Sequence, residues 1–583
     1  MPVTKRERGL VIGLVLFFAL QAFLSMLAKS ATADEPLYLA AGDRILRTGD
    51  LETNEISSPF LLKPLVAVPL LLLTLDRPPG DSVLHGGKLI DQWLYARRFL
   101  YGSGADPDLM LGLCRGMSIL LGMMLALSSY SLARSLLGRG AALAMLALFS
   151  VSPHLLAHTR LATLDIGLAL LTIECLRHWE RYLRGAGWRP VILAGIFLGL
   201  GFVAKTATLA LAIYLGVVLV GRAVSTWWRP AGPPLRPSPL KALVVIGLLS
   251  LLVVNGAFGF KGSLRPLAQL EGGGAKLEAA LGKLGSGIKG WVAHHVPLPL
   301  PASYQRLVLE QGGRASSPKQ VYFHGELRPG GWWWFMGVAW ALKTPLAVVM
   351  AVVAGFVALG STVLGFRGEP RGRVWAVLGY APLLLVFYSF VDRFGLVRYL
   401  LPAEPLVLMA AGSLVARLWR PGKLARGAAV GLLLLAAVPS WLSHPHYLAF
   451  TNVLTGGPNQ AYRWFADSNL DWGQDLRGLA EYTQRHGVQE IWLSYFGSAD
   501  PDALGLRYRR LPSIGFPPLL PGELWWFEDP SPRLPENLSG TVAISANCLA
   551  GILFPDPDLF ARFRDLEPIA QVGHSILVYQ VAP

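Results

Sequence analysis

Residues 9–38 read GLVIGLVLFFALQAFLSMLAKSATADEPLY, an apolar run that ends in a pair of adjacent carboxylates, Asp34 and Glu35. The run is long enough to cross the hydrocarbon core of a bilayer as a helix, which takes about 20 residues. Three basic residues precede it, and no cleavage pattern of small residues follows it. The sequence therefore predicts a retained first transmembrane helix, with the two carboxylates at its exit from the membrane.

The overall composition is that of a membrane protein. The 583 residues are 53% hydrophobic and only 15% charged, which is too apolar for a soluble multidomain enzyme. The formal net charge is +15, but Lys and Arg fall in short clusters between apolar runs, which argues against nucleic-acid binding. The three cysteines have no metal-type spacing, so no disulfide framework or zinc site is implied.

Ten further apolar runs are long enough, or nearly long enough, to span a bilayer, which predicts about 11 transmembrane helices. The runs between residues 140 and 221 are short and closely spaced, so the count is open by one in either direction. The runs are residues 111–136, 140–158, 161–178, 190–204, 206–221, 241–260, 332–362, 373–391, 397–418 and 424–443.

The basic residues predict the orientation of the chain. With the N-terminus in the cytoplasm, the clusters near residues 134–139, 177–189, 222–241, 367–373 and 417–426 share that side. The connections on the other side carry few cations, namely Arg160, Lys205, Arg393 and Arg398. This asymmetry is what the positive-inside rule predicts. A multi-pass protein of the inner or plasma membrane is expected, with the loops at 29–110 and 261–331 and the C-terminal tail outside the cytoplasm.

Two regions differ from the membrane spans. Residues 59–75 are apolar but short and are interrupted by Lys63-Pro64, which favours a helix lying in the membrane interface. From residue 444 onward the chain is more polar, with helical spacing at 474–486 and strand-like alternation at 490–496, 541–546 and 575–581. We therefore predict a transmembrane catalytic domain over residues 1–443 and a small extracytoplasmic α/β domain over residues 444–583.

The outer face gathers both acids and cations. The carboxylates are Asp34, Glu35 and Asp165, and the cations include Lys63, Lys205 and Arg398. Transfer of a sugar from a phosphate-linked donor needs a carboxylate base and cations that hold the departing phosphate. Ionisable groups at the ends of spans are rare and tend to line sites.

Structural interpretations compete with this one. The lysine and arginine side chains also suit contact with lipid headgroups. Asp34 could instead cap the N-terminus of the following helix, and Asp165 could instead form a structural ion pair with Arg160.

Several motifs in this order resemble those of GT-C glycosyltransferases. The resemblance is to family-39-like enzymes, the branch that holds the protein O-mannosyltransferases and the lipid A aminoarabinose transferases. It covers most of residues 1–443. The motifs are Asp34-Glu35, Lys63-Pro64, residues 159–165 (TRLATLD), residues 201–205 (GFVAK) and residues 398–402 (RYLLP). The resemblance implies a polytopic, mainly α GT-C fold and inverting transfer outside the cytoplasm.

The resemblance also implies roles for individual residues. Asp34 would be the general base, Glu35 its companion in acceptor or base positioning, and Asp165 a second acid at the sugar and acceptor site. The remaining residues would assist: Lys63, Lys205 and Arg398 would neutralise the lipid phosphate, Arg160 would orient Asp165, and Tyr38 would support the site. Leu62 stands where the aminoarabinose transferases carry an acid, which leaves the sugar and the acceptor open.

The partners implied are a polyprenyl-phosphate-linked sugar such as mannose or another hexose, an acceptor protein, lipid or glycan, and membrane lipids. No cofactor is certain, although carboxylates at Asp34, Glu35 and Asp165 could bind a divalent cation. Three rival functions differ in class. A transporter or flippase would place charges near the midplane in two related halves, an oligosaccharyltransferase or glycan ligase would transfer a whole glycan, and a scaffold would not need the outer charges.

Overall fold

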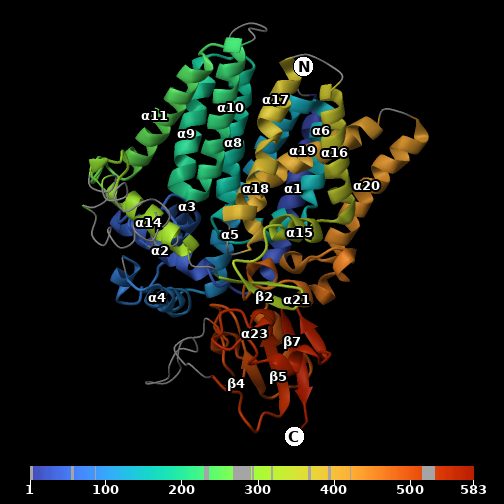
Figure 1. Cartoon of the computed structure of the whole chain (residues 1–583). Coiled ribbons are helices and arrows are strands. Elements are labelled where there is room, and N and C mark those ends of the chain that lie inside the picture. The colour runs from blue at the N-terminus through green and yellow to red at the C-terminus, as the bar shows by residue number, and fades with distance from the viewer. Residues whose placement is uncertain are drawn as a thin grey trace.

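The computed structural model describes residues 4–53, 58–85, 87–228, 235–266, 269, 291, 295–316, 319–364, 369–391, 395–419, 422–514 and 532–582. Arg393 and a large part of the 261–331 loop lie outside these residues. The chain forms a tall helical bundle, with short helices packed at one end and a small β-sheet beyond them (Figure 1). The expectation of a mainly α, polytopic membrane fold with a small C-terminal sheet region is confirmed.

The bundle is built from helices that lie along its length (Figure 1). They are α1 (Lys5–Leu27), α5 (Pro107–Leu137), α6 (Arg139–Ser150), α8 (Asp165–Leu183), α9 (Trp188–Ala204), α10 (Leu209–Trp228), α11 (Pro239–Ala257), α16 (Leu346–Leu364), α17 (Glu369–Leu378), α18 (Tyr380–Val391), α19 (Glu404–Leu418) and α20 (Lys423–Leu442).

Among the described residues, 7 helices are long and apolar enough to cross a membrane, or up to 8 if α6 and the bent helix after it, α7 (Pro153–Thr159), form one span. Shorter apolar helices cover Leu62–Leu72, Trp188–Ala204 and Leu346–Ser361. The protein is therefore an integral membrane protein. The expected number of about 11 spans stays a prediction, as does the orientation.

Helix α8 is a bundle helix that carries buried charges. It carries Glu174 and Glu180 near its end, yet both are buried. Arg177 Nη2 lies 2.5 Å from Glu174 Oε2, and Arg184 Nε lies 2.5 Å from Glu180 Oε1. Since α8 packs against α5 and α9, protein surrounds these charges and their partners satisfy them.

Small residues let the helices of the bundle approach closely. A Cβ atom at Gly412 on α19 would lie 2.6 Å from the carbonyl oxygen of Ala141 on α6. A Cβ at Gly355 on α16 would lie 2.2 Å from the carbonyl oxygen of Ala410 on α19. Close backbone contact of this kind is how membrane helices gain packing energy without a hydrophobic driving force between them.

The apolar run expected as one span over 332–362 is instead two elements. Helix α15 (Phe335–Leu342) ends before Lys343, and α16 starts at Leu346 after Pro345. Proline fixes its own backbone and disfavours a helical residue before it, so the helix breaks here. The interruption places Lys343 outside the candidate spans.

The predicted interfacial segment is a short helical pair, α3 (Leu62–Ala67) and the 3-10 helix η1 (Val68–Leu72). It packs against α2 (Glu35–Thr48), which begins directly after Asp34. The other elements at this end of the bundle are η2 (Asp81–Leu84), α4 (Leu89–Gly102), η3 (Thr206–Thr208), α14 (Ala302–Ser316), η5 (Val397–Ala403) and a hairpin of β1 (Gln320–Phe323) and β2 (Glu326–Pro329).

The C-terminal sheet has the strand order β4-β3-β5-β7-β6. Strand β3 pairs in parallel with β4 and β5, whereas β7 pairs antiparallel with β5 and β6. The strands are β3 (Ile491–Ser494), β4 (Tyr508–Arg510), β5 (Gly540–Ser545), β6 (Ala570–Val572) and β7 (Ile576–Val581).

Short helical turns lead from the bundle to this sheet: η6 (Tyr447–Ala449), η7 (Val453–Thr455), η8 (Pro458–Gln460), α21 (Ala461–Trp464) and η9 (Asp467–Asn469). Helix α22 (Leu476–Arg485) follows them, and η10 (Asp502–Leu504), α23 (Ala546–Ala550) and α24 (Ala561–Arg564) complete this region. One hydrophobic cluster continues from α1 through these turns to β7. The division at residue 443 stays a prediction.

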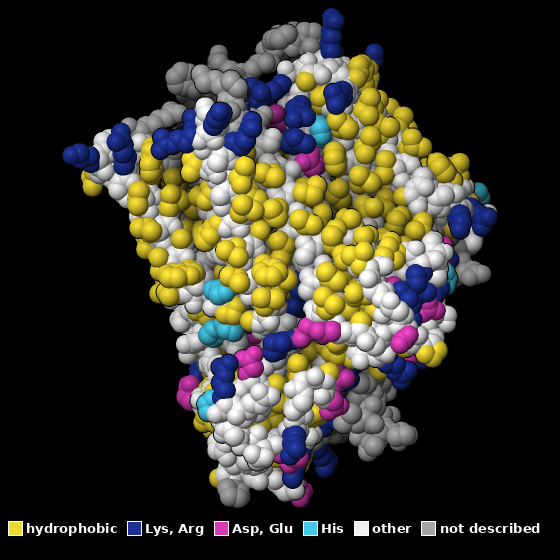
Figure 2. Space-filling view, turned by 180° about the vertical axis from the view of Figure 1, so that it is seen from behind, with side chains coloured by type: hydrophobic (Ala, Val, Ile, Leu, Met, Phe, Trp, Pro, Cys, Tyr) yellow, Lys and Arg dark blue, Asp and Glu magenta, His cyan; other side chains and the backbone are white. Residues whose placement is uncertain are grey.

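Charge separates the two ends of the molecule. Figure 2 shows Lys and Arg gathered at the end of the bundle away from the sheet, above a broad hydrophobic surface. Toward the sheet, acidic and basic side chains are mixed (Figure 2). This distribution is the asymmetry on which the predicted orientation depends.

Candidate active site

The loop between α1 and α2 is fixed by the segment that follows η9. The backbone N–H of Ser30 donates to the carbonyl of Gln474 at 3.0 Å, and that of Ala33 donates to the carbonyl of Trp472 at 2.8 Å. The Ser498 hydroxyl donates to the carbonyl of Ala33 at 2.7 Å. The residue before Asp34 is therefore held by parts of the chain more than 400 positions away.

Glu35 is fully buried, and its two oxygens accept five hydrogen bonds. Arg115 donates in a two-pronged pair, Nε to Oε1 at 2.8 Å and Nη2 to Oε2 at 2.7 Å. The N–H and hydroxyl of Thr32 donate to Oε2 at 2.9 and 3.0 Å. The N–H of Ala162 donates to Oε1 at 2.8 Å. Burial alone would raise the pKa of Glu35, but the charge and hydrogen bonds of Arg115 lower it overall.

Arg115 connects this carboxylate to the end of the first helix. Its Nη1 donates to the carbonyls of Met26 at 3.2 Å and Lys29 at 2.9 Å, and its Nη2 donates to that of Ser30 at 2.7 Å. The last turn of α1, the loop and the start of α2 thus share one buried guanidinium. Glu35 has no spare acceptor for a substrate proton, so its contacts suit the positioning part of its predicted role.

Asp34 precedes the first residue of α2, but its side chain does not cap the helix. The carboxylate retains 23% of its exposure and lies 3.5 Å from Nη1 of Arg398. Burial raises the pKa of Asp34 above its usual range, and the charges of Asp467 and Asp165 add to the rise, whereas Arg398 and Lys205 oppose it. A carboxylate with a raised pKa and an accessible oxygen is suited to accept a proton.

Asp165 and Lys205 form an ion pair beside Asp34. Lys205 Nζ lies 2.6 Å from Asp165 Oδ1 and 4.9 Å from the centre of the Tyr399 ring. The Arg398 guanidinium stacks on Trp472 at 4.1 Å. The structure thus brings together four of the predicted site residues, Asp34, Asp165, Lys205 and Arg398.

Tyr38 lies one helical turn after Asp34 and packs with Leu62 and Leu164. Burial raises the pKa of its hydroxyl well above the usual value, and the charge of Asp34 adds to the effect. The tyrosine therefore stays protonated and can donate a hydrogen bond at the edge of the four-residue cluster.

Lys63 and Arg160 donate hydrogen bonds to other segments of the chain. The Lys63 ammonium is buried and donates to the carbonyls of Thr53 at 3.3 Å and Ser58 at 2.9 Å. Arg160 Nη1 donates to the carbonyl and hydroxyl of Ser25 and to the carbonyl of Pro445. Within the described part of the chain Arg160 forms no ion pair with Asp165, whose partner is Lys205. The ion pair between Arg160 and Asp165, which was the structural alternative for Asp165, is therefore not found among the described residues.

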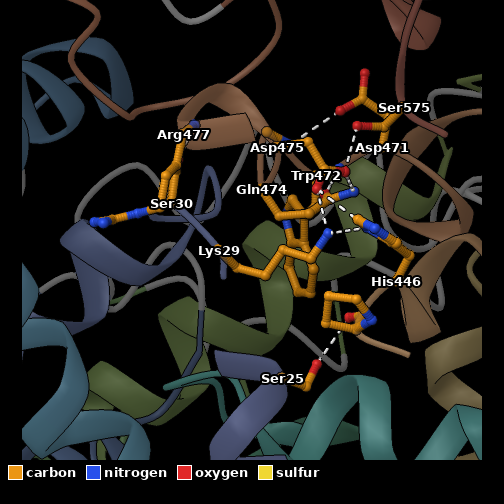
Figure 3. Close-up of polar contacts among 12 residues, drawn as sticks. Ser25, Lys29, Ser30, His446, Asp471, Trp472, Gln474, Asp475, Arg477 and Ser575 are labelled. Atoms are coloured by element: carbon orange, nitrogen blue, oxygen red, sulfur yellow. Dashed lines mark hydrogen bonds and ion pairs between the residues drawn. The ribbon is translucent and has the colours of Figure 1, made fainter. Parts of the chain in front are cut away.

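A second buried ion pair joins the α1–α2 loop to the C-terminal region. Figure 3 shows Lys29 and His446 pointing toward Asp475. Asp475 Oδ2 also accepts from the hydroxyl of Ser575 at 2.7 Å and the side-chain amide of Gln474 at 2.8 Å. Burial lowers the pKa of Lys29 to about 8. Burial alone would raise the pKa of Asp475, but Lys29 and His446 bring it below the usual range.

Sequence reasoning missed Arg115, Lys29 and Asp475 as parts of this site. Arg115 is an ionisable residue inside the apolar run 111–136. Such a residue within a membrane span is a recognised signal of a functional site. Asp475 lies in the polar stretch 467–475, and it was not among the predicted site residues. The described residues contain no group of three or more His, Cys, Asp or Glu side chains placed to hold a metal ion.

The family model of dolichyl-phosphate-mannose-protein mannosyltransferases matches residues 113–250. No curated protein matches the chain in sequence. The match includes the motifs at 159–165 and 201–205, and the expected similarity to this branch of the GT-C glycosyltransferases is confirmed.

Three solved structures are among those found similar to this chain. ArnT from Cupriavidus metallidurans bound to undecaprenyl phosphate is 12% identical over 98% of this chain and 97% of its own, with a TM-score of 0.45. The archaeal oligosaccharyltransferase AglB from Archaeoglobus fulgidus is 12% identical over 83% of this chain and 59% of its own, with a TM-score of 0.48. The Pmt1-Pmt2 protein O-mannosyltransferase of S. cerevisiae is 17% identical over 45% of this chain and 33% of its own, with a TM-score of 0.32.

Replacing Glu35 with Gln should destabilise the protein strongly. The change leaves the Arg115 charge buried without its counter-charge, and breaking such a pair costs about 3–5 kcal/mol. The measurement is the free energy of unfolding in detergent by chemical denaturation. Glu481→Gln is the matched control, because Glu481 and its partner Arg485 are 50% and 73% exposed and such pairs contribute at most about 1 kcal/mol. Equal losses in the two variants would contradict the structural role of Glu35.

Proposed function

Because residues 113–250 are similar to the mannosyltransferase family, we propose that the protein is a membrane glycosyltransferase. It moves a single sugar, such as mannose or another hexose, from a polyprenyl-phosphate donor to an acceptor outside the cytoplasm. The observation that carries the proposal is the cluster at the outer end of the bundle, where the raised-pKa carboxylate of Asp34 lies beside Arg398 and near the Asp165–Lys205 pair.

The cluster suits a direct displacement. Asp34 takes the proton of the acceptor's hydroxyl or other nucleophilic group. At the same time the nucleophilic atom of the acceptor bonds to the anomeric carbon. The bond from that carbon to the phosphate oxygen breaks, and its electron pair stays with the lipid phosphate. Fixed cations stabilise the negative charge that develops there, which is the function we assign to Arg398 and Lys205. Attack opposite the leaving group inverts the anomeric centre.

Asp34 is better placed than Asp165 to act as the general base. The Asp165 side chain is only 6% exposed and pairs with Lys205 at 2.6 Å, so its charge already has a partner. Asp34 is 23% exposed and its contact with Arg398 is longer, at 3.5 Å. Asp165 then acts by holding the Lys205 ammonium in place, and Glu35 by fixing the backbone from which Asp34 projects.

The proposed orientation follows from the charges. The basic end of the bundle faces the cytoplasm with the N-terminus, and the cluster and the sheet region lie outside (Figure 2). In this arrangement the reaction takes place at the membrane surface, where a polyprenyl tail remains in the bilayer while its phosphate reaches Arg398.

Replacing Asp34 with Asn should nearly abolish transfer while leaving the fold intact. Loss of a general base lowers the rate by about a hundredfold to ten-thousandfold. The measurement is transfer of label from a panel of radiolabelled polyprenyl-phosphate hexoses and pentoses in membranes. Asp91→Asn is the control, because Asp91 is an exposed carboxylate on α4 at the same end of the bundle.

Unchanged transfer by the Asp34→Asn enzyme would exclude Asp34 as the base. No transfer by folded wild-type protein with any donor of the panel would favour the transporter or the en-bloc glycan ligase instead.

The pH dependence of transfer should report the same carboxyl group. Only the deprotonated base accepts a proton, so kcat/KM should rise with pH through the pKa of Asp34. Burial raises this pKa and Arg398 opposes the rise. The Arg398→Gln variant should therefore be slower and should also have its acid limb shifted to higher pH. Arg485→Gln, at an exposed position, should leave the profile unchanged. An acid limb that stays in place or moves to lower pH in Arg398→Gln would contradict the assignment.

A further inference from the structure

A turn of the C-terminal region, residues 467–472, borders the cluster on two sides. The carbonyl of its last residue accepts from the backbone N–H of Ala33, which directly precedes the proposed base, at 2.8 Å. In the middle of the turn, Oδ1 of Asn469 accepts from the backbone N–H of Val397 at 3.0 Å. Val397 is followed by Arg398. The first residue of this turn, Asp467, is therefore held close to both the base and its neighbouring cation.

The fold fixes Asp467 in an uncommon backbone conformation. Its φ is +56°, a region that side chains other than those of Asp, Asn and His seldom adopt. Asn547 on α23 holds the turn, because its Oδ1 accepts from the N–H of Asp467 at 2.6 Å and its Nδ2 donates to the carbonyl of Asp471 at 2.9 Å. The N–H of Asp471 donates in turn to the carbonyl of Asp467 at 2.9 Å. The position of the Asp467 side chain is thus set by a strand-to-helix junction of the C-terminal sheet.

One oxygen of Asp467 has no partner. Oδ1 accepts from the N–H of Ser468 and closes the turn. Within the part of the chain that the structure describes, Oδ2 makes no hydrogen bond, and no cationic side chain lies within ion-pair distance of Asp467. The side chain is half-buried, and Oδ2 is not enclosed by protein. Closing the turn needs one acceptor oxygen, so it does not account for a second, charged one beside the cluster.

The charge of Asp467 acts on the proposed base. Burial raises the pKa of Asp34, Arg398 opposes the rise, and the charge of Asp467 adds to it more than that of Asp165 does. The two carboxylates and two cations of the cluster, Asp34, Asp165, Lys205 and Arg398, balance one another. Asp467 adds a negative charge to this neutral set, and it is suited to accept hydrogen bonds from a bound substrate.

The other carboxylates of the site are less free to contact a sugar. Each hydroxyl group of a sugar is a donor that needs an acceptor once water has been displaced. Asp34 is assigned to the acceptor proton, Asp165 is paired with Lys205 at 2.6 Å, and Glu35 already accepts five hydrogen bonds. Among these carboxylates and Asp467, Asp467 is the one that has neither a counter-charge nor a part in proton transfer.

We propose that Asp467 helps to determine which sugar is transferred, by accepting a hydrogen bond through Oδ2 from a hydroxyl group of that sugar. The inference rests on the proposed function and adds to it a substrate contact from the C-terminal region. A site that accepts a hydrogen bond from a substrate hydroxyl rejects an analogue that lacks this group, because its own polar atom is then left unpaired. Selectivity among sugars is therefore the property that reports on Asp467.

Asp467→Asn removes the acceptor with little change to the turn. Asn also adopts positive φ more readily than most residues, and its side-chain oxygen can still accept from Ser468. Its NH2 group replaces Oδ2 and donates where the carboxylate accepts. Asp467→Gly, which also permits this φ, removes the side chain and serves if Asp467→Asn does not fold. Asp556→Asn is the matched control, because the exposed Asp556 likewise accepts from a nearby backbone N–H through Oδ1.

The experiment compares donors within each variant. The polyprenyl-phosphate hexose that the wild type transfers fastest is compared with donors that lack its 2-, 3-, 4- or 6-hydroxyl group. For one of these deoxy donors, kcat/KM of the wild type and of Asp556→Asn should be about tenfold to a hundredfold lower than for the complete hexose, as expected for a charged hydrogen bond. In Asp467→Asn this ratio should fall to about one, because only transfer of the complete hexose is slowed.

An unchanged ratio for every deoxy donor in Asp467→Asn or Asp467→Gly would overturn the proposal. This holds even if all rates fall together, because a purely structural defect slows every donor alike. In that outcome the wild type still transfers sugar, so the proposed function stands. Absence of transfer by the folded wild type with every donor would instead overturn the proposed function, and this inference with it.

Discussion

The buried pair of Glu35 and Arg115 is the constraint on which the proposed reaction centre depends. Asp34 is one residue before Glu35, and it follows a loop without regular structure. That loop is held because Arg115 donates to Glu35 and to three carbonyls at and after the end of α1. A buried charge pair with all its hydrogen bonds made has one low-energy arrangement, which specifies where the next side chain points.

The C-terminal region acts on the same loop from the other side. Trp472 accepts a backbone hydrogen bond from Ala33 and carries Arg398 on its ring. Lys29 pairs with Asp475, which is fixed in turn by Ser575 next to the terminal strand (Figure 3). The sheet region is therefore part of the catalytic assembly that we propose, because it positions both the carboxylate and the cation beside it.

The sequence predicted those features that depend on local pattern. The apolar runs at α1, α5, α11 and α20 became helices close to their expected bounds, and alternation located β3, β5 and β7. Strands β4 and β6 have only three residues each, which is too short for a periodic signal. The break at Lys343-Thr344-Pro345 was overlooked because the flanking residues are apolar on both sides.

Which charged groups meet was harder to predict. Asp34, Asp165, Lys205 and Arg398 were named from motifs and lie together. Lys63 and Arg160 have similar motif support, yet their donors are used by backbone carbonyls that only the tertiary fold brings within reach. Arg115 lies inside an apolar run, where a charge is expensive and therefore informative, and that signal could have identified it as part of the site.

The most direct test of the central claim is photo-crosslinking with a polyprenyl-phosphate sugar that carries a photoreactive group on the sugar, followed by mass spectrometry of the labelled peptides. The account predicts labels in residues 29–38, 158–165, 397–399 and 467–472, and their loss when unlabelled donor competes. Competed labels confined to the basic end of the bundle, near residues 177–189 or 417–426, would contradict a reaction centre at Asp34.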